Sequence, residues 1–110
     1  MDVQPDGLAV DVARQNGAHT VTLKGELDLN SSPGLRDLLH ELLDDGKGHL
    51  VIELSELSFV DSTGLGVLVG ALKKARQGGG DIELSTPTPA IRKALEITGL
   101  TQVFRVADGS

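Results

Sequence analysis

The stretch LSELSFVDSTGLGVLVGALKKAR, residues 54–76, decides how this chain folds. An apolar run typical of a strand, residues 50–54, leads into it, and a short polar connection then reaches Asp61. From Asp61 onward the spacing of apolar residues is helical. Asp61 is suited to cap this helix, because its short side-chain acceptor can reach the free N–H groups of the first turn. Cations at residues 73–76 suit the negative end of the helix dipole.

Ser62 falls in the first turn of this predicted helix, with its hydroxyl near the surface. The unpaired N–H groups and the helix dipole favour negative charge at that place. Phosphorylation would add about −1.5 to −2 of charge without melting the helix. Ser62 is therefore a candidate phosphorylation site, and the alternative is that it only shapes the turn. Thr63 is a second candidate acceptor, although a packed residue of the first turn is the interpretation that we favour for it.

An opening hairpin is predicted before this stretch. Apolar and other residues alternate with period two over residues 8–13, and the alternation resumes over residues 21–25. Between the two runs lies the dipeptide Asn16-Gly17, a strong signal for a two-residue turn. We therefore expect the first two strands to be antiparallel.

A first helix is predicted between the hairpin and the central stretch. Leucines recur at helical spacing over residues 35–43 and form one broad apolar stripe. Ser32 is the candidate cap, and Pro33 occupies the first helical position, where a missing N–H costs nothing. Gly46 is the expected stop.

The rest of the chain continues the alternation of strands and helices. The glycine run 78–80 ends the central helix, residues 82–84 mark a strand, residues 88–98 a third helix, and residues 103–106 a final edge strand. Such an order predicts an α/β domain with a mixed sheet of four to five strands. Because apolar and polar residues alternate in the strands, we expect the helices to pack mainly on one face of the sheet. The length of 110 residues predicts a single domain, with residues 1–7 and 107–110 as flexible ends.

Composition narrows the class of protein. The chain has 16 acidic and 10 basic residues and a net charge of −6. Nucleic acids and anionic membranes favour clustered Lys and Arg, so we expect neither as a partner. The absence of cysteine excludes disulfide and thiol chemistry. The chain begins with no signal-peptide pattern and has no apolar run near the roughly 18 residues of a membrane span, so we expect a cytoplasmic protein.

Three motifs, taken in order, resemble one family. Residues 59–68, FVDSTGLGVL, look like the signature of STAS domains, in particular of the bacterial anti-sigma factor antagonists. Residues 25–28, GELD, match an earlier motif of the family, and residues 97–104 match a C-terminal one. The likeness runs from about residue 10 to residue 106 and implies the STAS fold.

The resemblance also implies a function. In similar proteins the unphosphorylated form binds an anti-sigma factor, which is itself a serine kinase, and so releases a sigma factor for transcription in stress responses or sporulation. Phosphorylation of the serine that matches Ser62 switches this binding off, and a serine phosphatase resets it. In similar proteins the residue matching Asp28 lies near the serine and helps phosphorylation or partner contact. The position of Asp28 at a predicted strand end also suits a simple turn or cap residue. The expected partner-binding residues are Asp28, Asp61, Ser62, Thr63, Gly64 and Leu65.

A second hypothesis is a STAS module without phosphorylation, which binds a small ligand such as a nucleotide or lipid, or scaffolds a signalling assembly. Gly64, Gly66 and Gly70 could be mistaken for a dinucleotide fingerprint. The strand before them is not expected to run directly into the turn, and a second mononucleotide-binding half is missing. Close packing of the helix explains the glycines better.

Enzymatic activity is not expected. Ser62 lacks the pattern Gly-x-Ser-x-Gly of a hydrolase nucleophile, and the chain has no phosphate-binding loop, so any ATP must come with the partner. His19, His40 and His49 are scattered and show no metal-ligand spacing. We therefore expect no cofactor and no metal, while weak self-association stays open.

Overall fold

The computed structural model describes residues 2–3, 7–15, 17–44 and 48–108. The chain forms one mixed sheet with the strand order β1-β2-β3-β4-β5-β6. The first three strands are antiparallel, and β3 to β6 are parallel. In chain order the elements are β1 (Asp2–Val3), β2 (Leu8–Gln15), β3 (Ala18–Leu27), α1 (Ser32–Asp44), β4 (His49–Val60), α2 (Ser62–Gln77), β5 (Asp81–Ser85), α3 (Pro89–Ile97), a 3-10 helix η1 (Leu100–Gln102) and β6 (Arg105–Ala107).

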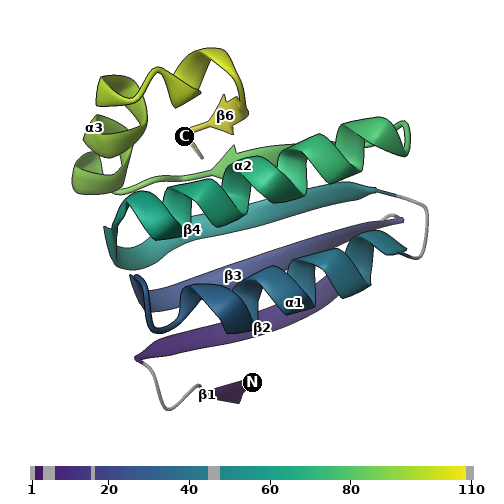
Figure 1. Ribbon diagram of the computed structural model, residues 1–110, viewed down its shortest axis with the longest axis horizontal. Helices are drawn as coiled ribbons and strands as arrows, with labels where there is room; N and C mark the ends of the chain where they lie inside the picture. Colours follow the sequence, from purple (N-terminus) through teal and green to yellow (C-terminus); the bar gives the residue numbers. More distant parts are fainter. Residues whose placement is uncertain (1, 4–6, 16, 45–47, 109–110) are drawn as a thin grey trace.

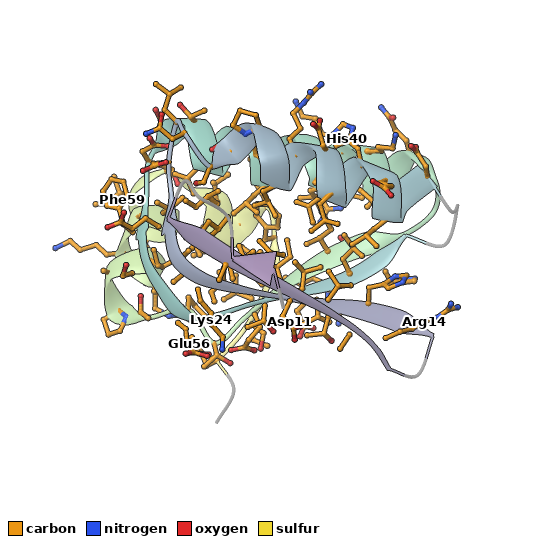
Figure 2. The ribbon with its side chains drawn as sticks, turned by 90° about the horizontal axis from the view of Figure 1, so that it is seen from below. Asp11, Arg14, Lys24, His40, Glu56 and Phe59 are labelled. Carbon is orange, nitrogen blue, oxygen red and sulfur yellow. The ribbon has the colours of Figure 1, made fainter. Side chains whose placement is uncertain are left out.

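Helices α1 and α2 lie side by side over one face of the sheet (Figure 1). Figure 2 shows both of them on one side of the strands, with Asp11, Lys24 and Glu56 on the other. The chain continues from β5 into α3 and η1, which lie toward the β6 edge (Figure 1). The prediction of an α/β fold with a mixed sheet and helices mainly on one face is therefore confirmed.

The core is aliphatic, as the scarcity of aromatic residues requires. Alternate residues of β4, among them Leu50, Ile52 and Leu54, point toward the helices and are buried. Leu68 and Leu72 of α2 are buried as well. Removing such side chains from water is the main favourable term in folding.

The hairpin was predicted correctly. β2 and β3 pair antiparallel, with Gln15 opposite Ala18 next to the turn. Asn16, and with it half of the predicted turn dipeptide, lies outside the described residues. The final strand is confirmed as β6, a parallel edge strand on β5, but it begins at Arg105, two residues later than predicted. The two-residue strand β1, in the segment expected to be a flexible end, was not predicted and adds a sixth strand.

Strand β4 is longer than predicted. It runs through Ser55–Val60, which the sequence pattern assigned to a polar connection, and Asp61 follows at once. Its pairing with β3 shifts register between Thr22 and Lys24 and between Gly25 and Glu26, and at each shift β4 contains one more residue than β3. Such irregularities break strict alternation and hide a strand from period-two analysis. The expectation that no strand runs directly into the turn is thus wrong, although the opening antiparallel hairpin still differs from a dinucleotide-binding fold.

The start of α1 also differs from prediction. Ser32 is the first residue of the helix and is buried. Its hydroxyl donates to the Asp28 carbonyl oxygen at 2.6 Å, so Ser32 does not cap the helix with its side chain. The predicted stop at Gly46 lies outside the described residues.

Candidate functional site

The site begins where two neighbouring parallel strands end. β3 and β4 are paired up to Leu27 and Val60, so their carboxyl ends meet at one edge of the sheet. The residues that follow, Asp28 and Asp61, are thereby brought together from two distant motifs. The backbone N–H of Asp61 donates to the Leu27 carbonyl oxygen at 3.1 Å, which joins the two strand ends.

Asp61 is the N-cap of α2, as predicted. Its backbone is extended, and its Oδ1 accepts a hydrogen bond from the Gly64 N–H at 2.9 Å. Its Oδ2 accepts a second bond from the backbone N–H of Leu29 at 3.0 Å. One carboxylate therefore caps the helix and holds the loop between β3 and α1. We call this pair of bonds the Asp61 clamp.

Ser62 is the first residue of the 16-residue helix α2, and its side chain is exposed. Among the described residues its hydroxyl has no hydrogen-bond partner. Another protein can thus reach it, at the end of a helix where negative charge is favoured. Thr63 is also exposed, so the expectation that it is a packed residue is wrong.

Gly64 and Leu65 are buried beneath this surface. A Cβ on Gly64 would lie 2.7 Å from Leu27 Cγ and 2.9 Å from the Leu27 carbonyl oxygen, so only glycine fits. These two residues support the site from within and do not present side chains to a partner. A Cβ on Gly66 or Gly70 would meet nothing within 4 Å, so close packing inside this chain does not explain those two glycines.

Asp28 organises the loop that approaches Ser62. Its Oδ1 accepts hydrogen bonds from the N–H groups of Asn30 and Ser31 at 3.0 and 3.1 Å. The buried Ser31 hydroxyl lies 3.3 Å from the same oxygen and donates to the Glu26 carbonyl oxygen at 2.9 Å. The structure thus gives Asp28 the turn role that its sequence suggested. Sequence reasoning missed Ser31, whose position three residues after an aspartate was the available signal.

Two large apolar side chains at this end of the molecule were also missed. Leu29, in the β3–α1 loop, is 68% exposed, and Phe59, near the end of β4, is 49% exposed. Figure 2 shows Phe59 projecting at the end of the molecule opposite the hairpin residue Arg14. The signal for Leu29 was an apolar residue within an otherwise polar loop.

Metal-ligand clusters and membrane-spanning helices are both absent from the described part of the chain. Its His, Asp and Glu residues form no group of three or more that could hold a metal ion. None of the helices within that part combines the length and the apolar character that spanning a bilayer demands.

Comparisons with known proteins agree with this geometry. The family model of the STAS domain matches residues 9–109. An anti-sigma-B factor antagonist of Bacillus subtilis is 36% identical over 98 residues, which cover 89% of each chain. The crystal structure of an anti-sigma factor antagonist from Mycobacterium paratuberculosis superposes with a TM-score of 0.84 at 29% identity, covering 94% of this chain and 88% of that one. The Bacillus cell fate determinant SpoIIAA, solved in its phosphorylated form, gives a TM-score of 0.72 at 25% identity over 90% of this chain and 91% of its own. The chain therefore belongs to the STAS domain family, among the anti-sigma factor antagonists.

Proposed function

We propose that the unmodified chain binds an anti-sigma factor that is also a serine kinase, and that this binding releases a sigma factor for transcription. Phosphorylation of Ser62 then switches the binding off. The observation that carries the proposal is the exposed Ser62 hydroxyl, which has no partner within the described residues and lies at the start of a capped helix. The names of the relatives, and the existence of a phosphorylated form of one of them, support it.

The charge of the phosphate is sufficient for a switch. A phosphoserine adds about −1.5 to −2 of charge beside the Asp61 carboxylate. The helix end tolerates this charge in the free protein, so we expect the fold to survive. In an interface the same charge must lose water next to other carboxylates, which can cost several kcal/mol. A penalty of about 3 kcal/mol weakens binding about a hundredfold.

The other components of the switch follow from the chemistry of the site. Because this chain shows no phosphate-binding loop, the partner supplies ATP and transfers the phosphoryl group, and this chain is the substrate and not the enzyme. A serine phosphatase completes the cycle by removing the phosphate. Since sigma factors act on transcription, we place the protein in the cytoplasm.

The test is phosphorylation by the serine-kinase anti-sigma factors of the source organism, each incubated with the chain and Mg-ATP. We expect intact-protein mass spectrometry to show one added phosphoryl group and fragmentation to place it on Ser62. Ser62→Ala should abolish the modification, whereas the matched variant Thr63→Ala should keep it. If Ser62→Ala is modified to the same extent as the wild type, this site is wrong. A nucleotide or lipid retained by the purified protein would instead favour the ligand-binding hypothesis.

A further inference from the structure

We infer that Leu29 and Phe59 form the apolar surface by which the anti-sigma factor recognises the unmodified chain. We call them the Leu29–Phe59 surface. The inference rests on the proposed function and adds to it the part of the site that supplies affinity. Ser62 alone offers one hydroxyl, and a small polar group contributes little to holding a partner, whereas large apolar side chains dominate most interfaces.

The Leu29–Phe59 surface stands out against the rest of the chain. Large apolar side chains of the described residues are almost all buried, and those that are exposed comprise Val12, Leu29, Phe59, Ile97 and Val103. Leu29 and Phe59 belong to the two strand-end segments that build the site around Ser62. Val12, Ile97 and Val103 belong to other segments of the chain, and exposed apolar residues within the segments that build a functional site mark an interaction surface more reliably than scattered ones do.

The Asp61 clamp holds Leu29 in place before a partner arrives. The backbone N–H of Leu29 is bonded to Asp61 Oδ2, and the next two N–H groups of the loop are bonded to Asp28 Oδ1. Phe59 is equally fixed, because it lies within β4 opposite Glu26. A surface that is already ordered loses little conformational entropy on binding, so its apolar area contributes more fully to affinity.

The same clamp connects the surface to the phosphorylation site. One carboxylate oxygen of Asp61 accepts a hydrogen bond from the Leu29 N–H, and the other accepts one from the first turn of α2. Ser62 is the next residue in the chain. A partner that binds at Leu29 therefore docks against the loop that this carboxylate ties to the start of α2, where the Ser62 hydroxyl is exposed. A phosphate there would have to lose its water against apolar groups, which gives the switch its physical cause.

The charge around the Leu29–Phe59 surface indicates which class of partner binds there. No Lys or Arg occurs in residues 25–35 or 53–72, whereas Glu26, Asp28 and Asp61 carry carboxylates there. A second copy of this chain or an anionic lipid surface would bring like charges together, which is unfavourable. The exposed Glu26 has no ion-pair partner among the described residues. The surface thus fits a protein with an apolar recess for Leu29 and Phe59 and a cationic group facing Glu26.

The test is isothermal titration calorimetry of variants against the anti-sigma factor that phosphorylates the wild type. We expect Leu29→Ala and Phe59→Ala each to weaken binding about tenfold or more, as truncation of a central apolar contact does. The conservative variants Leu29→Met and Phe59→Leu should bind within about threefold of the wild type, because they keep most of the apolar area. Val12→Ala is the control, because Val12 is an exposed apolar residue in the middle of β2 and belongs to neither of the segments that build the site.

The outcomes separate this inference from the proposed function. If the wild type binds and is phosphorylated while Leu29→Ala and Phe59→Ala bind as tightly as the wild type, the inference is wrong and the proposed function stands. If no anti-sigma factor binds or modifies the wild type, the proposed function itself fails. If sedimentation shows a dimer that Phe59→Ala dissociates, the occupant is a second copy and the inference is overturned. Thermal unfolding of each variant verifies that the fold is intact.

Discussion

The carboxylate of Asp61 accepts a hydrogen bond from the backbone N–H of Leu29, at 3.0 Å and across 32 residues of sequence. The same side chain caps α2 through the Gly64 N–H. Two segments that each look like an ordinary loop in the sequence thereby become one surface with Ser62 on it. A change at Asp61 should consequently affect both the helix and the loop.

Asp61→Asn should separate these two roles. An asparagine keeps one acceptor oxygen, which can still cap α2, but its amide nitrogen cannot accept a bond from the Leu29 N–H. We expect a loss of about 1 kcal/mol in the free energy of unfolding for Asp61→Asn, and about 1 kcal/mol more for Asp61→Ala, which also removes the cap. Urea unfolding measures both. Hydrogen exchange should show Leu29 deprotected in both variants and Gly64 only in Asp61→Ala; a protected Leu29 amide in Asp61→Asn contradicts the clamp.

Gly64→Ala and Gly66→Ala should have opposite effects on stability. An alanine Cβ at position 64 would collide with Leu27, so we expect a loss of about 1–3 kcal/mol in the free energy of unfolding. At position 66 the space is open, and alanine is the better helix former by about 0.8–1 kcal/mol, so stability should rise. Both values come from urea denaturation at a single temperature. Equal effects of the two variants would show that packing against Leu27 does not require Gly64.

Ser62→Asp should weaken binding of the partner without destabilising the fold. An acidic residue in the first turn of α2 interacts favourably with the helix dipole, by about 0.3–1 kcal/mol, so the free energy of unfolding should stay constant or rise. Its charge should nevertheless reduce affinity for the anti-sigma factor about tenfold or more. The neutral variant Ser62→Asn has nearly the same shape and controls for size. If calorimetry gives the same affinity for Ser62→Asp and Ser62→Asn, charge is not what the partner senses.

Thr86→Asn should stabilise the loop between β5 and α3. Thr86 has φ of 53°, a left-handed backbone conformation that disfavours β-branched residues, and among the non-glycine residues described it is the one with positive φ. Asparagine adopts this conformation more readily, so we expect a gain of about 0.5–1 kcal/mol in the free energy of unfolding. Thr88→Asn is the matched control, because Thr88 has ordinary φ and asparagine also caps helices well. A larger gain at position 88 than at position 86 would contradict this explanation.

Local signals were sufficient for much of the site. Asp61 and Ser62 were assigned correctly to the cap and the first turn of α2, because a short acceptor followed by helical apolar spacing depends only on neighbouring residues. The aliphatic stripe of α1 and the opening hairpin were predicted for the same reason. The interpretations that failed depended on packing. Thr63 is exposed because it lies on the side of α2 that faces away from the core. Gly66 lies in open space, although its sequence neighbourhood resembles that of Gly64.

The sequence by itself determined the order of elements, the mixed α/β class and the place of Ser62 at a helix start, since periodicity and capping act over a few residues. Only the tertiary structure decided which segment lies beside Ser62. The parallel pairing of β3 with β4 sets the two strand ends at one edge, and that register, together with the extra residues in β4, brings Leu29 to the Asp61 carboxylate. Register depends on contacts among residues far apart in the chain, so no local pattern could contain it.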